Sequence, residues 1–187
     1  VDSAGRTSAS NILAIGDLCA GPMLAHRATA DARRVVATLC GKANDGEEVD
    51  SLLVPAVVFT DPELAWCGLT ETEARASGRE ITVSRVPWLA SGRAHSMSRT
   101  DGLTKLVLEP GSGRILGAGI VGVGAGELIA EAVLAMSAGL TASQLAAAIH
   151  AHPTLSETLA EAAEHSDLDH GHVHRLVGEP EQRSRRQ

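Results

Sequence analysis

The stretch HAHPTLSE, residues 150–157, decides how the whole chain is interpreted. It places His152 directly before Pro153, and it places the carboxylate of Glu157 five residues after this histidine. Because a proline disfavours helical geometry in the preceding residue, we expect His152 in a loop and Glu157 in the first turn of a following helix. A carboxylate that accepts from one ring N–H leaves the other ring nitrogen basic. The stretch therefore predicts a general base.

The same residues also have a structural interpretation. Thr154 and Glu157 have the spacing of a capping box, with Thr154 as the N-cap and Glu157 accepting from the backbone N–H of the cap. Spacing alone favours a cap over a base by roughly two to one, because capping boxes are common at helix starts. One glutamate can serve both purposes, so both interpretations stay open on spacing.

The composition is that of a folded chain without an affinity for polyanions. Of 187 residues, 44% are hydrophobic and 21% are charged, which are globular values. The net charge of -7, without a basic stripe, argues against nucleic acid or an anionic membrane as a partner. No apolar run approaches the ~20 residues of a membrane span, so we expect a cytoplasmic protein. Cys19, Cys40 and Cys67 fit neither a zinc site nor a redox pair, and they predict free thiols and no metal.

The first part of the chain predicts one strand and one helix. NILAIGD, residues 11–17, is interpreted as a short buried strand that ends in Asp17, at the position where α/β sheets bind ligand hydroxyls. GPMLAHRA, residues 21–28, opens a helix that should continue to about Cys40 and end at Gly41. The polar residues that follow have the composition of a linker.

The second part predicts strands, short capped helices and a hairpin. We expect strands at residues 54–60, 81–86, 103–109 and 115–121, the last two joined by the turn PGSG, and helices after Thr70, over residues 127–138 and after Thr141. GAGIVG, residues 117–122, has the spelling of a dinucleotide fingerprint, but it lies in a hairpin strand, which favours close backbone packing instead. The helix over 127–138 is apolar on several faces, which suits coverage by a second subunit.

Three motifs carry a resemblance to a known family. HPTLSE at 152–157 with AAE at 162–164 resembles the C-terminal signature of the flavin-dependent pyridine nucleotide-disulfide oxidoreductases, specifically the dihydrolipoyl dehydrogenases. AIGD with GPMLAHRA is similar to the second FAD motif of the family, and FTDPELA at 59–65 is similar to the entry of its dimerisation domain. The resemblance extends from residue 1 to about residue 174.

The resemblance implies roles for individual residues. His152 corresponds to the acid-base catalyst and Glu157 to its orienting partner. Asp17 corresponds to the residue that binds the ribityl chain of FAD. Contacts to the flavin, chiefly through backbone at a helix N-terminus, are implied for Met23, Leu24, Ala25 and His26. The chain departs from the family at Asp31 and Ala32, where Glu-Gly is usual.

The resemblance also implies a reaction. The chain would be the C-terminal part of a homodimeric enzyme that oxidises dihydrolipoamide, carried by a 2-oxo acid dehydrogenase complex, and passes electrons through a disulfide and FAD to NAD+. The FAD site is only partly present, the NAD site falls outside this chain, and the fragment alone should be inactive. Two alternatives stay open: a non-catalytic dimerisation module, and a disulfide reductase of the glutathione or mercuric reductase type. Metal binding by the His-rich end is disfavoured by its mixed spacing without cysteine.

These expectations define an α+β fold: an interface domain with an antiparallel sheet flanked by helices, preceded by the C-terminal strand and helix of a FAD-binding α/β domain. Residues 1–44 are assigned to the FAD-binding domain and 45–52 to a linker. Residues 53–164 are assigned to the dimerisation domain, and 165–187 to a polar, His-rich tail.

Overall fold

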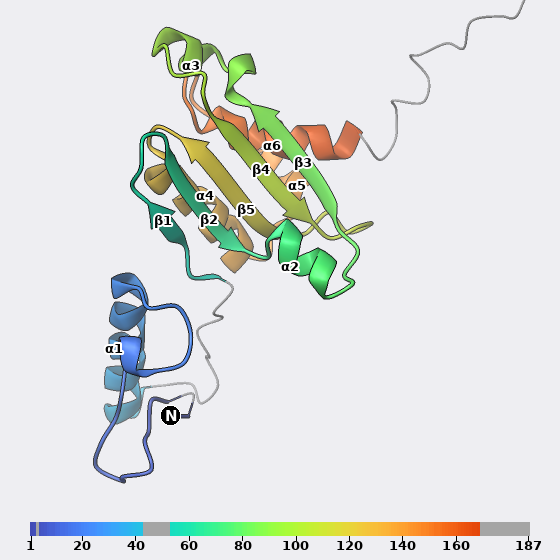
Figure 1. The fold of residues 1–187 in the computed structure, drawn as a ribbon. Coiled ribbons are helices and arrows are strands. Elements are labelled where there is room, and N and C mark those ends of the chain that lie inside the picture. The colour runs from blue at the N-terminus through green and yellow to red at the C-terminus, as the bar shows by residue number, and fades with distance from the viewer. Residues whose placement is uncertain (3, 43–52, 169–187) are drawn as a thin grey trace, which may run out of the picture.

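A computed structural model describes residues 1–2, 4–42 and 53–168 of the chain (Figure 1). The predicted linker and residues 169–187 of the predicted tail lie outside the described residues. In chain order the elements are η1 (Gly16–Leu18), α1 (Ala25–Leu39), β1 (Ala56–Val58), β2 (Glu63–Gly68), α2 (Glu71–Ala76), β3 (Thr82–Pro87), η3 (Trp88–Ala90), α3 (Gly92–Ser96), β4 (Leu103–Leu108), β5 (Ile115–Gly122), α4 (Ala125–Ser137), α5 (Ala142–Ala146) and α6 (Glu157–Leu168).

A five-stranded antiparallel sheet with the order β1-β2-β5-β4-β3 forms the centre of the larger part of the chain. Helices α4, α5 and α6 lie against one face of this sheet (Figure 1). The predicted α+β class is thereby confirmed. The predicted β4–β5 hairpin is present as well, and Gly111 and Gly113 take positive φ values in its turn, a conformation that glycine adopts without steric cost.

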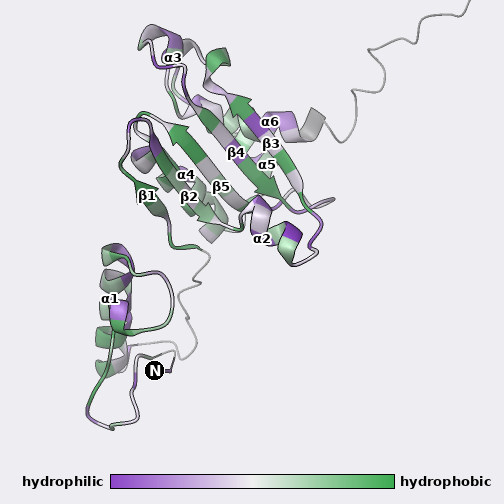
Figure 2. Ribbon diagram, in the orientation of Figure 1, coloured by the Kyte–Doolittle hydropathy of each residue, from purple (hydrophilic) through white to green (hydrophobic). Residues whose placement is uncertain are grey.

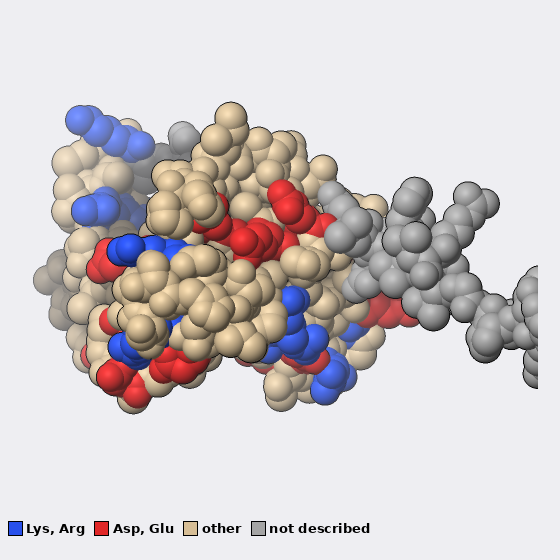
Figure 3. Space-filling view, turned by 90° about the horizontal axis from the view of Figure 1, so that it is seen from above, with Lys and Arg blue, Asp and Glu red and all other residues tan. Residues whose placement is uncertain are grey.

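Side-chain alternation along the strands separates a buried face from an open one. Trp88, Leu106, Ile120 and Leu159 are fully buried between the sheet and the helices. Figure 2 shows hydrophobic residues concentrated in the strands, with a more hydrophilic region around α3. On the face seen in Figure 3, acidic and basic side chains are interspersed and form no continuous basic stripe.

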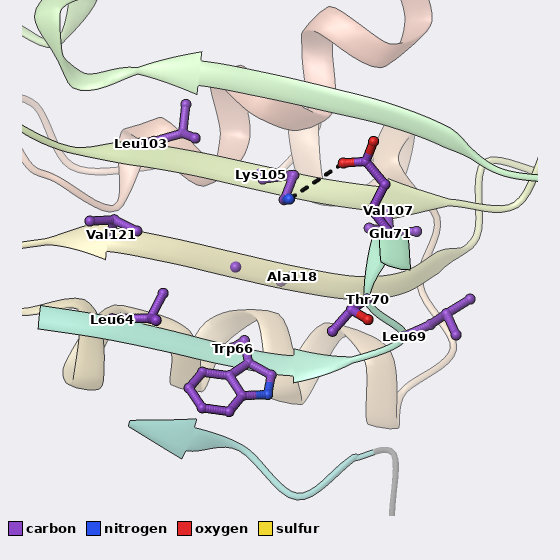
Figure 4. A pocket seen from close by; sticks show the side chains of 11 residues that line it. Leu64, Trp66, Leu69, Thr70, Glu71, Leu103, Lys105, Val107, Ala118 and Val121 are labelled. Carbon is purple, nitrogen blue, oxygen red and sulfur yellow. Dashed lines mark hydrogen bonds and ion pairs between the residues drawn. The ribbon is translucent and has the colours of Figure 1, made fainter. Parts of the chain in front are cut away.

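The open face of the sheet carries an apolar hollow of about 320 Å³ (Figure 4). Trp66, Leu64 and Val121 lie on its floor, on strands β2 and β5. At one end, the ammonium of Lys105 lies 3.5 Å from the carboxylate of Glu71. Helix α2 begins at one end of this hollow, whereas α4, α5 and α6 lie against the opposite face of the sheet.

Two segments differ from the sequence predictions. The predicted strand at residues 11–17 is wrong: Leu13 makes an isolated bridge to Arg6, and the chain then enters η1. A strand needs a neighbour along its length for its N–H and C=O groups, and among the described residues this segment has only that one bridge. Conversely, β2 was not predicted, since ELAWCG is poor in β-branched residues; its pairing with both β1 and β5 overrides that propensity.

The glycines of the GAGIVG stretch support the packing interpretation. A Cβ at Gly117 would lie 2.1 Å from the carbonyl oxygen of Leu69, and one at Gly122 would lie 2.3 Å from the Trp88 ring. Such distances are far below contact distance, so a side chain at either position would displace its neighbour. Gly119 has open space, so crowding does not explain the glycine there.

Candidate active site

His150 and His152 both lie in the loop between α5 and α6. Nδ1 of His152 is 2.8 Å from Oε1 of Glu157, the first residue of α6. Because the carboxylate only accepts, Nδ1 carries the proton in the neutral ring and Nε2 holds the free lone pair. The His152 side chain is 78% exposed, and no group in the described part of the chain hydrogen-bonds to Nε2. The loop therefore presents an oriented, accessible base.

The second oxygen of the same carboxylate serves the helix start. Oε2 of Glu157 accepts from the backbone N–H of Thr154 at 2.7 Å. In a complete capping box the Thr154 hydroxyl would also accept from the backbone N–H of Glu157. Here this hydroxyl instead donates to the carbonyl of Ala151 at 2.7 Å. Glu157 thus acts as a partner of His152 and as a partial cap at once, one oxygen for each purpose.

The ionisation of Glu157 follows from these bonds. The backbone N–H of Thr154, and then the His152 ring, lower the pKa of the Glu157 carboxyl. Charge attraction from His152 and His150 acts in the same direction. The group is therefore an anion at neutral pH, and both of its oxygens can accept hydrogen bonds.

A second imidazole–carboxylate pair lies beside the first. Nε2 of His150 is 2.6 Å from Oε1 of Glu131 on α4, and its Nδ1 is 3.0 Å from the carbonyl oxygen of Ala148. Burial lowers the pKa of His150, but the bonds to Glu131 and Ala148 and the charges of Glu131 and Glu157 outweigh it, so the pKa is raised. Sequence reasoning missed this pair. The only indication of it in the sequence was Glu131, which lies within the predicted helix over residues 127–138.

A buried series of hydrogen bonds fixes the segment between His152 and Glu157. Nε1–H of Trp88 donates to the hydroxyl of Thr104 at 3.0 Å, and this hydroxyl is 2.8 Å from that of Thr158. The Thr158 hydroxyl donates its one proton to the carbonyl of Leu155 at 2.7 Å. Thr104 must therefore donate to Thr158, so the series of hydrogen bonds runs in one direction, from the sheet to the loop that carries His152.

The residues predicted to contact FAD lie on the N-terminal segment. Asp17 is exposed in η1, Met23 is exposed before α1, and Leu24 is the N-cap of that helix. Leu24 makes no side-chain cap bond, so the N–H groups in the first turn of α1 are available to an acceptor on a ligand. Nε2 of His26 lies 2.6 Å from the carbonyl oxygen of Pro55.

Asp31, where the chain departs from the family pattern, has a structural role. Its buried carboxylate accepts from the backbone N–H of Gly16 at 3.1 Å and pairs with the guanidinium groups of Arg27 and Arg34. These bonds tie the turn that carries Asp17 to α1. No hydrogen bond between described residues joins this segment to the His152–Glu157 pair.

Comparison with known proteins defines the class. Residues 54–163 match the dimerisation domain of the pyridine nucleotide-disulphide oxidoreductases, and the chain belongs to this family. Among curated relatives, it is similar to dihydrolipoyl dehydrogenase of Bacillus subtilis (strain 168), with 44% identity over 121 residues, which are 65% of this chain and 25% of that protein. For the enzyme of Vibrio parahaemolyticus the identity is 42% over 122 residues, again 65% and 25%. The chain spans about a quarter of the length of these relatives.

Solved structures agree with this assignment. LpdA from Mycobacterium tuberculosis superimposes with a TM-score of 0.83 at 28% identity, covering 88% of this chain and 36% of that one. The HOCl-induced flavoprotein disulfide reductase RclA from Escherichia coli gives a TM-score of 0.79 at 34% identity, covering 88% and 38%. The predicted resemblance to this family and to the dihydrolipoyl dehydrogenases is confirmed. Within the described residues, no helix has the length and apolar character needed to span a membrane.

Proposed function

We propose that this chain supplies the acid-base histidine of a flavoprotein disulfide oxidoreductase, with His152 as the base and Glu157 as its orienting partner. The observation that supports it most directly is the 2.8 Å bond between Nδ1 and Oε1, beside a ring that is otherwise open to solvent. The curated relatives are named dihydrolipoyl dehydrogenase, so dihydrolipoamide is the substrate that we propose.

The chemistry assigned to His152 is proton transfer. A thiolate, and not a thiol, attacks a disulfide sulfur, so the substrate dithiol must lose a proton. Nε2 of His152 takes this proton, and the Glu157 carboxylate stabilises the resulting imidazolium through Nδ1–H. The ring returns the proton when the reaction reverses. Bound FAD, held in part by Asp17 and by the start of α1, would supply the route for the electron pair to NAD+.

The exposed surface also supports a partner subunit. The side chains of Leu134, Ile149 and Phe59 are apolar and exposed to water, and burying them against a second subunit is favourable. We propose a cytoplasmic homodimer, with the domain boundaries given above, in which the second subunit brings the disulfide to His152. The description of the family as a dimerisation domain supports this assembly.

Replacing the base tests the proposal in the full-length protein. We expect His152→Gln to lower dihydrolipoamide oxidation by roughly 10²- to 10⁴-fold, the usual contribution of general acid-base catalysis. Flavin absorbance per chain should not change. His165→Gln, at an exposed position in the last turn of α6, is the matched control and should keep wild-type turnover. Wild-type turnover in His152→Gln would refute the role, and absence of turnover in the wild type itself would favour a non-catalytic dimerisation module.

A further inference from the structure

His150 has two hydrogen-bond partners that can only accept. Its Nε2 meets the carboxylate of Glu131 at 2.6 Å, and its Nδ1 meets the carbonyl of Ala148 at 3.0 Å. A neutral imidazole has a single N–H and can satisfy only one of them, whereas an imidazolium donates to both. The geometry therefore favours a cation at His150.

The surroundings of the ring are consistent with that charge. Helix α4 contributes the carboxylate of Glu131, and α6 contributes that of Glu157, which also binds His152 of the same loop. Helix α5 has no titratable residue. The His150 side chain is 10% exposed, so water replaces its protein partners poorly.

We propose that His150 is a positioning residue: its imidazolium ties the loop that carries His152 to α4 through Glu131, and so fixes the direction in which His152 faces the substrate. The inference rests on the proposed role of His152. His150 and His152 are alternate residues, and the first is buried against α4 while the second is open to solvent. A shift of the first ring therefore moves the backbone that carries the second.

The test uses Glu131→Gln, which keeps the shape and an acceptor oxygen but removes the charge. Glu127→Gln, one turn earlier on α4 and exposed, is the matched control. The first measurement is the pH titration of the histidine Cε1–H resonances in the 187-residue chain. We expect His150 to titrate at lower pH in Glu131→Gln than in the wild type, with no change in Glu127→Gln.

The second measurement is the pH profile of kcat and KM in the full-length protein. We expect Glu131→Gln to lower kcat roughly 10- to 100-fold, the cost of a slightly misplaced catalytic group, with little change in KM or flavin content. Because kcat should fall at alkaline pH as His150 loses its proton, we expect this fall to occur at lower pH in Glu131→Gln than in the wild type. An unshifted His150 titration, or a wild-type kcat profile in Glu131→Gln beside an inactive His152→Gln, would overturn the positioning role alone. An active His152→Gln would overturn the proposed function and this role together.

Discussion

His150 and His152 lie two residues apart and each bonds a glutamate, yet the two pairs differ in what they leave available. His152 uses one ring nitrogen for Glu157 and keeps the other toward solvent. His150 uses both nitrogens and is almost fully covered. One chemical pairing thus gives an accessible base in one place and a fixed cation in the other. The number of acceptors around the ring and its burial decide between them.

The two pairs also differ in how they are assembled. Glu157 is five residues from His152, so the local chain brings them together. Glu131 is 19 residues from His150, so that pair forms only when α4 packs beside the loop. We therefore expect the free energy of unfolding and the protonation of the two pairs to respond differently when each pair, or the buried hydrogen bonds next to it, is changed.

The largest expected effect comes from removing the buried support of the segment between His152 and Glu157. Thr158→Val removes the acceptor for the Thr104 hydroxyl, in a site without access to water, while the Leu155 carbonyl keeps its bond from the backbone N–H of residue 158. We expect a loss of about 2 kcal/mol in the free energy of unfolding, the cost of one buried donor left unpaired. Urea denaturation would measure it. Thr72→Val, at an exposed position of α2, is the control, and an equal loss in both variants would contradict the argument.

The second effect sharpens the contrast in protonation. The pKa of His150 is raised in the folded chain, so its contribution to stability is complete below the unfolded pKa of about 6.5 and is lost as pH rises through the folded pKa. Glu131→Gln should lower the free energy of unfolding by about 1.5 kcal/mol at pH 6, the value of a bond to a charged group. The difference from the wild type should shrink at higher pH. A difference that is constant from pH 6 to pH 9 would contradict a cationic His150.

The third effect asks whether the two pairs respond to any loss of stability. Thr70 and Glu73 form a complete capping box at the start of α2, away from the loop. Thr70→Ala should lower the free energy of unfolding by about 1 kcal/mol, whereas Thr70→Ser should keep most of it. In histidine titrations followed by NMR, neither variant should change the titration of His150. A shifted titration would show that the pairs are coupled to the whole fold.

The smallest effect concerns the exposed pair. The backbone N–H of Thr154 and the His152 ring lower the pKa of Glu157, so its contribution is present above the ordinary value of 4.5 and is lost as pH falls through the folded pKa. Glu157→Gln should make the melting temperature less dependent on pH between about 5 and 3, by a small amount because water screens the group. Glu164→Gln, further along α6, is the control.

What the sequence predicted divides along the same line between local and distant contacts. The hairpin turn, the capped starts of α2 and α5 and the contact of His152 with Glu157 were all predicted, because residues within five positions determine them. The His150–Glu131 pair and β2 depend on partners far away in the chain, which no spacing rule reveals. The strand expected at residues 11–17 failed for the same reason, since hydrophobicity alone does not provide a neighbouring strand. The roles of Asp17 and residues 23–26 toward FAD stay predictions.

The buried series of hydrogen bonds has one further consequence, for spectroscopy. The protein has two tryptophans. Trp88 donates the first of the buried hydrogen bonds that lead to Leu155, and Trp66 lines the hollow on the open face of the sheet. An indole held dry and hydrogen-bonded emits differently from one at a wet surface. A Trp66→Phe variant would leave Trp88 as the only indole, and its fluorescence would then report optically on the segment that joins His152 to Glu157.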